Sequence, residues 1–411
     1  MSNIINFGGG ATNIPTPFKP EGKSYLTFSS PNSFTLAVND TSKCWNGTLE
    51  YFASNKTWAV WNGATTLSSV DNDGEHVLYL RGIGNTIITG NGSSYRWVLT
   101  GNNIKCIGNI ENLLDYATVT AGNHPTMANY CYAYMFEDCT SLTQAPALHA
   151  TTLVSNCYSY MFRGCTALTQ APALPATTLA DYCYRSMFQG CTSLTQAPVL
   201  PATTLANYCY YYMFQGCTSL TKASVLPATT LADFCYFCMF YKCTSLTKAP
   251  ALPATTLARE CYSDMFHDCT SLTQAPDLPA TTLASKCYSS MFFGCTSLTQ
   301  APALPATTLA DYCYSNMFRG CTSLKLSTTQ TGEYIQKYRI PSSGTGTTAS
   351  NALTNMFTST GGTFTDTPSI NTTYYLSSDN MVVYDTEVAT LNGYVGSMID
   401  AAIGNAIGGS Y

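Results

Sequence analysis

Hydrophobic and polar positions recur in a fixed order between residues 130 and 324, where one 26-residue unit is written eight times. Each unit reads Cys-Tyr, two variable residues, Met-Phe, two further residues, a second cysteine, and then a segment rich in threonine, alanine, leucine and proline. The leading cysteines are Cys131, Cys157, Cys183, Cys209, Cys235, Cys261, Cys287 and Cys313. A constant period of this length predicts a solenoid, because one coil can bury its apolar side chains only against neighbouring coils.

Comparison of the eight units separates inward-facing from outward-facing positions. Both cysteines, the Met-Phe pair and three leucines recur, the leucines of the first unit being Leu142, Leu148 and Leu153. A free cysteine behaves as a small buried hydrophobe, so all these positions are expected to form core ladders. The residues before each leading cysteine, and the two before each Met-Phe pair, vary between units. We expect these variable positions to face solvent.

The Cys-x-x-Leu core, such as Cys139 to Leu142, is followed by a proline-bounded segment in unit after unit. This pattern covers about half of the chain and resembles the BspA-like, cysteine-containing leucine-rich repeats of bacterial and phage surface proteins. The resemblance implies a leucine-rich-repeat solenoid that acts in adhesion, with phage or prophage as the expected origin. This chain has Gln144-Ala145-Pro146-Ala147 where that family usually places branched residues. Proline cannot donate a ladder hydrogen bond, so we expect short strands and a narrow sheet.

Sixteen of the nineteen cysteines occupy the two repeating positions of the solenoid. Stacked coils lie about 5 Å apart, but their parallel Cβ vectors do not point at one another as a disulfide requires. We therefore predict ladders of reduced, buried thiols.

The segments before the solenoid differ in pattern. Residues 1–20 carry three consecutive glycines and several prolines, which predicts an extended arm, either a tether for a partner or a frayed terminus. Residues 21–107 contain short alternating runs separated by turn residues, which predict a small all-β domain of sandwich-like type. The predicted strands are 24–28, 33–38, 47–52, 57–61, 76–81, 86–89 and 95–99. Residues 108–129 form a linker and N-terminal cap, with a helical turn expected at 111–115.

All four tryptophans lie in this all-β domain, at positions 45, 58, 61 and 97. Two interpretations stay open for them. They form either a platform on which carbohydrate stacks or, as is usual in a small β domain, part of the core and its edge.

The repeat decays after the solenoid. Residues 325–384 are predicted to be a degenerate capping region, in which Asn355-Met356-Phe357 repeats the Met-Phe of the coils. Residues 385–411 are predicted to be a short helix and tail. Its apolar positions follow the spacing of a helix that pairs with a copy of itself or with a partner, although a helix packed back on the solenoid has the same pattern. The candidate assembly residues are Val388, Leu391, Val395, Met398 and Ala402.

Composition removes several classes of function. Only 10% of the residues are charged, against about 25% in an ordinary globular protein. With a net charge of −5 and no cluster of lysine or arginine, no nucleic-acid partner is expected. No apolar stretch approaches the length of a membrane span. The first residues lack the basic and apolar regions of a secretory signal.

The sequence shows no spacing typical of a catalytic or metal-binding site. The four histidines are scattered, at positions 76, 124, 149 and 267, and none has the spacing of a metal ligand or general base. Cys235 and Cys238 make one Cys-x-x-Cys, but Cys238 fills a variable slot. Asp264 and Asp268 are the nearest approach to a carboxylate pair and occur in one unit only. We predict a non-enzymatic protein without cofactor or metal.

Aromatic residues are frequent at the variable positions. Rings offer a large contact area with few rotatable bonds, which suits recognition of a host-surface glycan or protein. The alternative is that the rings shield the narrow edge of the solenoid. The candidate binding face comprises Tyr130, Tyr134, Tyr160, Tyr182, Tyr211, Tyr212, Phe234, Phe237, Tyr241, Phe293 and Tyr312.

Three functions remain. The first is a virion-associated fibre, spike or decoration protein that adheres to the host and joins other virion proteins, or further copies of itself, through the N-terminal arm or C-terminal helix. The second is a bacterial cell-surface adhesin with the same repeats. The third is a purely structural spacer.

Overall fold

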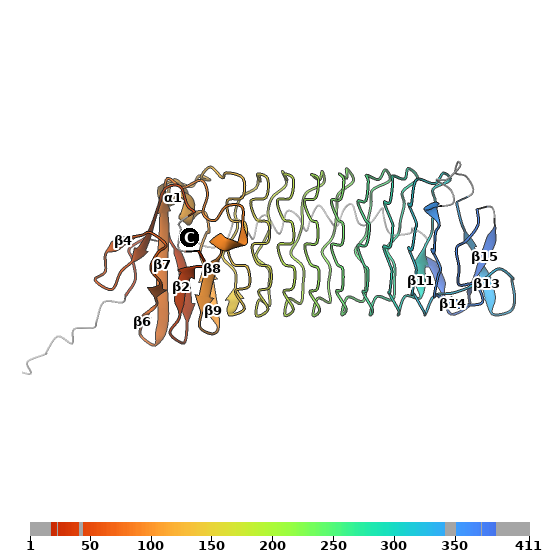
Figure 1. The fold of residues 1–411 in the computed structure, drawn as a ribbon, viewed down its shortest axis with the longest axis horizontal. Coiled ribbons are helices and arrows are strands. Elements are labelled where there is room, and N and C mark those ends of the chain that lie inside the picture. The colour runs from red at the N-terminus through yellow and green to blue at the C-terminus, as the bar shows by residue number, and fades with distance from the viewer. Residues whose placement is uncertain (1–17, 23, 41–43, 342–350, 371, 384–411) are drawn as a thin grey trace, which may run out of the picture.

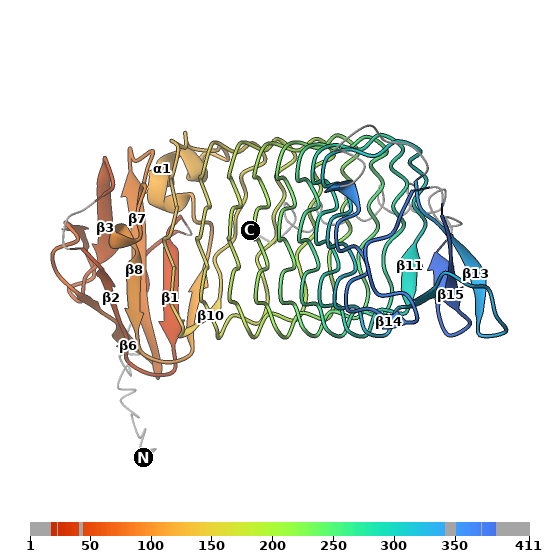
Figure 2. The same ribbon diagram turned by 45° about the vertical axis from the view of Figure 1, so that its right-hand side comes forward.

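The computed structural model describes residues 18–22, 24–40, 44–341, 351–370 and 372–383. These form an elongated, mainly β rod whose coils are stacked along its axis (Figures 1 and 2). A β region covers one end of the stack and a smaller sheet covers the other. The one α-helix that lies wholly within the described residues is α1 (Asn112–Thr120), which is longer than the turn predicted at 111–115.

The N-terminal region consists of two antiparallel sheets. Its strands are β1 (Leu26–Ser30), β2 (Thr35–Val38), β3 (Thr48–Phe52), β4 (Trp58–Trp61), β5 (Leu67–Ser68), β6 (Val70–Asn72), β7 (Glu75–Ile83), β8 (Trp97–Thr100) and β9 (Ile104–Ile107), with a 3₁₀ turn at Ser93–Tyr95. One sheet has the order β9-β1-β7-β3-β4 with β6 also on β7, and the other has the order β5-β2-β8. The prediction of a strand at 86–89 is wrong. The amides of Ile88 and Thr89 instead donate to the carbonyl of Cys131, so this segment docks on the first coil.

This region and the solenoid share one hydrophobic core. Strand β9 pairs in parallel with β10 (Leu142–Gln144) of the first coil. Trp97 donates its amide to the carbonyl of Met135 at 2.8 Å, and the rings of Phe28 and Phe136 lie 6.1 Å apart. The N-terminal sheets therefore cap the first coil directly.

Most of the tryptophans lie in this core. Trp45, Trp61 and Trp97 are at most 2% exposed, which removes them from any carbohydrate platform. Trp58 is half-buried and lies 4.2 Å from the guanidinium of Arg81. The end of the predicted N-terminal arm is also packed, since Phe18 is buried with its ring 5.3 Å from that of Phe52.

The segment from the leading to the second cysteine of each coil is a run of linked turns. Every fourth residue has a positive φ, which is 62° at Tyr130, 61° at Tyr134 and 59° at Asp138. Amides alternate between two acceptors: Ala133 donates to Tyr130 in its own coil, whereas the next residue, Tyr134, donates across to Ser159 in the following coil. The left-handed conformation costs roughly 1–2 kcal/mol per non-glycine residue. Glycine before the second cysteine, as at position 164, avoids this cost in five coils.

This backbone turns Cys-Tyr and Met-Phe inward as pairs. The tyrosines that follow the leading cysteines, Tyr132 to Tyr314, are at most 1% exposed, and their rings stack at 5.6–5.9 Å. The phenylalanines form a parallel ladder at 5.6–5.7 Å from Phe136 to Phe318. The tyrosine ladder is a core feature that comparison of the units did not identify.

The two cysteine ladders differ in their hydrogen bonds. Seven of the eight thiols of the second ladder donate to a phenylalanine carbonyl of the preceding coil, as Cys217 Sγ does to Phe188 at 3.1 Å. The eighth, Cys139, donates to the carbonyl of Trp97. In the leading ladder, Cys209 faces the backbone N–H groups of Ala206 and Tyr210 instead. All nineteen cysteines are unpaired, and every one except the half-buried Cys44 is buried.

The proline-bounded segments contribute little regular strand, as predicted. Apart from β10 and β11 (Gln300–Pro302), the coils of the described solenoid are joined there by isolated bridges such as Gln196 to Lys222. Across the stack, threonines make similar bridges, as between Thr204 and Thr230.

The far end of the solenoid is closed by a ninth, divergent coil. Phe318 donates its amide to Met356 at 3.0 Å, and Phe357 continues the phenylalanine ladder at 5.6 Å. A sheet of order β13-β15-β12-β14 covers this coil. Its strands are β12 (Lys325–Ser327), β13 (Tyr334–Arg339), β14 (Gly361–Gly362) and β15 (Thr373–Ser377), and β16 (Met381–Val383) pairs with β11. The predicted C-terminal helix and residues 1–17 of the arm lie outside the described residues.

In the native protein, iodoacetamide at about pH 8 is expected to modify Cys44 alone, because burial hides the other thiols and raises their pKa, that of Cys191 to about 12. Mass spectrometry of the intact protein and of its peptides measures this. Unfolded protein is the control and should take up nineteen adducts. Rapid native modification of a second cysteine would contradict the buried ladders.

Cys217→Ala is expected to lower the free energy of unfolding by about 1 kcal/mol more than Cys209→Ala does, because only the first loses an S–H donor bond to a backbone carbonyl as well as volume. Urea unfolding followed by circular dichroism measures the difference. Cys217→Ser keeps a donor and should recover part of the loss. Equal losses at the two positions would show that the thiol bond contributes nothing.

Candidate binding face

The variable positions form a ridge along the solenoid, and their exposure depends on side-chain size. The expectation that all of them face solvent is wrong: Ser186, Cys238 and Ser263 are only 2–4% exposed. A small side chain sinks between its neighbours, whereas a ring at the same position lies over them. Burial, followed by the negative charge of Asp264, raises the pKa of the Cys238 thiol well above its usual range, and a hydrogen bond with the Tyr212 hydroxyl opposes this rise only in part. Cys238 is therefore an inert buried thiol.

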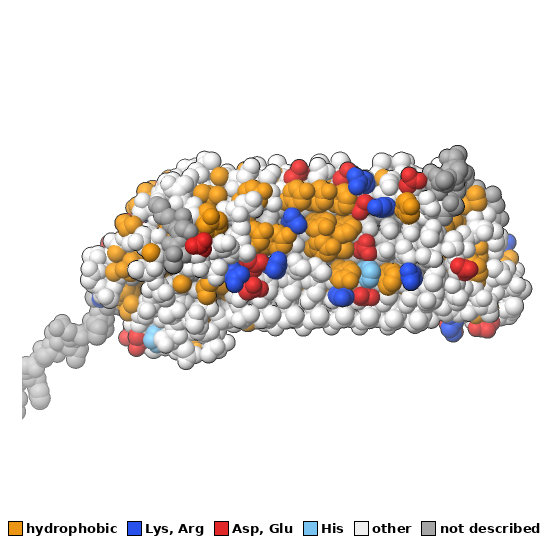
Figure 3. Space-filling view, in the orientation of Figure 1, with side chains coloured by type: hydrophobic (Ala, Val, Ile, Leu, Met, Phe, Trp, Pro, Cys, Tyr) orange, Lys and Arg blue, Asp and Glu red, His pale blue; other side chains and the backbone are white. Residues whose placement is uncertain are grey.

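Hydrophobic side chains gather over the middle coils and are bordered by charged side chains (Figure 3). Ring contacts define one connected group there, which we call the six-ring patch: Tyr182, Tyr208, Tyr211, Tyr212, Phe234 and Phe237. Three of these rings form a stack, with Tyr208 4.5 Å from Tyr182 and 4.6 Å from Phe234. Five of the six residues were in the predicted binding face.

A second, shorter stack lies beside the first. The rings of Tyr211 and Phe237 are stacked at 5.0 Å, and Tyr212 packs edge-on against Tyr211 at 4.4 Å. Contacts of 5.6 Å between Tyr208 and Tyr211, and 5.8 Å between Phe234 and Phe237, join the two stacks. All six side chains are half-buried. The patch is thus a continuous aromatic surface built from three successive coils.

The stacking decides which part of each ring is accessible. Within a stack the ring faces point along the solenoid axis and cover one another, so the surface presents ring edges and tyrosine hydroxyls. The edge of an aromatic ring carries the positive end of its quadrupole. The patch is therefore better suited to negative groups and hydrogen-bond acceptors than to flat apolar surfaces.

The other predicted binding residues lie outside the patch. Tyr134 and Tyr160 form a stacked pair at 4.7 Å. Tyr241 and Phe293 flank His267 at 4.7 and 4.4 Å in a separate row. Among the described residues, Tyr130 and Tyr312 make no ring contact.

Sequence reasoning missed Tyr208 and His267 as members of the aromatic rows. The signal for Tyr208 was present, because it occupies the same position in its coil as Tyr182 and Phe234 do in theirs.

Several aromatic rows of the ridge end at a positively charged side chain. Arg259 lies 5.1 Å from the Phe234 ring, and Arg319 lies 5.5 Å from Phe293. Arg185 lies among three tyrosine rings at the other end of the patch. A cation over the last ring face replaces the stacking partner that the next coil does not supply.

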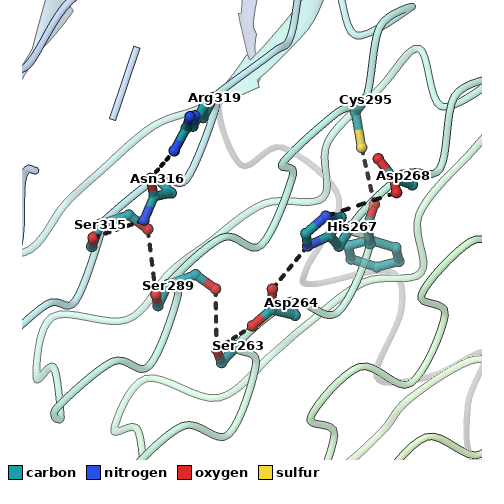
Figure 4. A network of polar contacts seen from close by, with 10 residues as sticks. Ser263, Asp264, His267, Asp268, Ser289, Cys295, Ser315, Asn316 and Arg319 are labelled. Carbon is teal, nitrogen blue, oxygen red and sulfur yellow. Dashed lines mark hydrogen bonds and ion pairs between the residues drawn. The ribbon is translucent and has the colours of Figure 1, made fainter. Parts of the chain in front are cut away.

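Beyond the patch the ridge becomes polar (Figure 4). His267 Nδ1 lies 2.9 Å from Asp264 Oδ1, and its Nε2 lies 3.8 Å from Asp268. The Ser263 hydroxyl donates to Asp264 Oδ2 at 2.9 Å rather than to the imidazole, so the serine–histidine hydrogen bond of an activated nucleophile is not formed. The sequence indicated no histidine–carboxylate pair, yet the fold makes this one and another, in which His124 Nδ1 lies 2.9 Å from Glu111.

Within the described residues, no group of three or more histidine, cysteine, aspartate or glutamate side chains is placed to hold a metal ion. The described helix α1 has nine residues and falls short of what a membrane crossing requires.

Residues 111–247 and 208–344 match the family described as BspA type leucine rich repeat region, present in six copies. Searches of curated proteins and of solved structures gave no match. The two matched ranges together cover more than half of the 411 residues, and they coincide with the stacked coils. The chain belongs to the BspA-type leucine-rich repeat family and is an adhesion-like repeat protein.

Proposed function

We propose that this chain is a non-enzymatic adhesion protein of a phage particle, where it serves as a fibre, spike or decoration and presents the six-ring patch to a protein or glycan of the host surface. Membership of the family supports an adhesive role. The resemblance of the repeats to those of phage surface proteins supports a location on the virion. A bacterial cell-surface adhesin with the same repeats is the alternative location.

The six-ring patch is the observation that carries this proposal. Aromatic residues such as Tyr208, Tyr211 and Phe237 occupy positions where other coils have serine or asparagine. The coil therefore does not need a ring there to fold. Aromatic side chains dominate the energetics of many interfaces, and a rigid backbone keeps them from losing entropy on binding. A cluster of dispensable, half-buried rings on such a scaffold is suited to contact with a partner.

The triple variant Tyr208→Asn, Tyr211→Ser, Phe237→Ser is expected to lose at least about tenfold in affinity for host cells, because interface aromatics commonly contribute more than 1 kcal/mol each. Each new residue occurs at the same position of another coil, so the fold should persist. Binding of fluorescently labelled protein to the bacterium that carries or hosts the sequence measures the change.

The matched control is Tyr312→Asn, which changes an exposed ring at the equivalent position without a ring contact among the described residues. This control should bind as the unmodified protein does. If the triple variant also binds normally, the patch is not an adhesion surface, and a structural spacer becomes the better description.

Peptides of this chain are expected in purified virions at a constant ratio to the other structural proteins, and not in the cell-wall fraction of uninfected bacteria. Quantitative mass spectrometry of both fractions gives the answer. Recovery from the cell wall instead would place the protein on the bacterial surface.

A further inference from the structure

Arg185 occupies an unusual position at the edge of the six-ring patch. Its guanidinium carbon lies 5.2 Å from the Tyr160 ring, 5.6 Å from Tyr182 and 5.5 Å from Tyr211. The Nε atom is buried and has no hydrogen-bond partner among the described residues. An unpaired buried donor of a charged group carries an uncompensated loss of hydration. The rings compensate part of the charge but accept no hydrogen bond in the plane of the guanidinium.

The other six arginines of the chain all have polar partners. The partners are Glu50 for Arg81, Glu137 for Arg96 and Arg163, Glu260 for Arg259, Asn316 for Arg319, and the carbonyls of Leu304 and Ala306 for Arg339. Arg185 alone has neither a hydrogen bond nor an ion pair among the described residues. Asp181 and Asp233, which flank the patch, accept backbone amides of the following coil and are already engaged.

The chemistry around Arg185 favours an anion. A guanidinium binds a carboxylate through two parallel hydrogen bonds, and its planar fork fits that group better than an ammonium does. The positive ring edges and tyrosine hydroxyls of the patch act in the same direction.

A sugar ring stacks on an aromatic face, but the faces within the stacks are covered by neighbouring rings. The patch thus favours an acidic polypeptide over a glycan.

We propose that Arg185, together with Tyr160, Tyr182 and Tyr211, is a subsite that receives an aspartate or glutamate side chain from an acidic segment of a protein partner. This inference rests on the proposed function, since it names the class of partner for the same face. The chain carries a net charge of −5, so long-range attraction does not guide such a partner. Short-range pairing at Arg185 gives the contact its strength.

The test uses fluorescein-labelled decaglutamate and full-length protein, with binding followed by fluorescence anisotropy. Arg185→Gln is expected to weaken binding about tenfold, the size of effect typical for loss of a charge-assisted hydrogen bond. Arg185→Lys keeps the charge but not the fork, and should also weaken binding. The matched control is Arg319→Gln, which removes another arginine stacked on a ring of this ridge and should bind within about twofold of the unmodified protein.

Circular dichroism and thermal melting identify variants that fail to fold, and Arg185→Lys keeps the test open if Arg185→Gln unfolds. Three results would overturn the subsite. The first is no decaglutamate binding by the unmodified protein up to about 1 mM, and the second is an equal loss of affinity in the Arg185 and Arg319 variants. The third is a preference for polygalacturonate over decaglutamate, which would assign the site to an acidic glycan. Host-cell binding that depends on Tyr208, Tyr211 and Phe237 would stand in each case, so failure of the subsite is distinguishable from failure of the adhesive role.

Discussion

The structure depends on one constraint, which is that each coil places its side chains directly over those of the coil before it. Amides of the linked turns donate to carbonyls one coil away, as Phe188 does to Met213 at 2.9 Å, and this register repeats without a shift across the solenoid. Identical side chains must then contact one another, so the core positions have to be groups that stack on copies of themselves. Planar rings at 5.6–5.9 Å, small thiols and leucines meet that requirement. The uniformity of the repeat follows from this geometry.

The same constraint leaves the ridge free to vary. The left-handed residues recur every fourth position, and two of the three in each coil carry the variable side chains, as Tyr182 and Ser186 do in theirs. Because each of these residues donates its backbone amide to the following coil, as Tyr182 does to Asn207, the side chain can change without altering the register. Where similar rings fall in adjacent coils they stack on the surface as they do in the core. Where they do not, the ridge is polar, as around Ser263 and Asp264.

The repeating half of the chain was predictable because its units can be compared with each other. Comparing the residues at one position across the units predicts the period, the buried cysteines, the buried Met-Phe pairs and leucines, and the short strands at proline. The buried tyrosine ladder did not, because tyrosine in a chain with few charges is equally suited to a surface, and only the linked-turn backbone turns Tyr184 inward. The burial of small side chains such as Cys238 depends on neighbouring side chains, which cannot be read from the spacing of residues along the sequence. The docking of residues 86–89 on the first coil could not be predicted, because the two segments share no sequence pattern.

The candidate site shows the same limit, since its residues could be named while their orientation could not. Five members of the six-ring patch were predicted. Stacking of the rings decides that the patch presents ring edges rather than ring faces. This stacking depends on Tyr208, which completes the row between Tyr182 and Phe234. Arg185 occupies the next equivalent position before Tyr211, so the in-register stacking that builds the core also places a cation against the end of an aromatic stack. An arginine in this place meets no carboxylate of its own chain because the coils on either side supply rings. The ridge thus combines a positive group with an aromatic surface, and a partner that brings a carboxylate completes the pair.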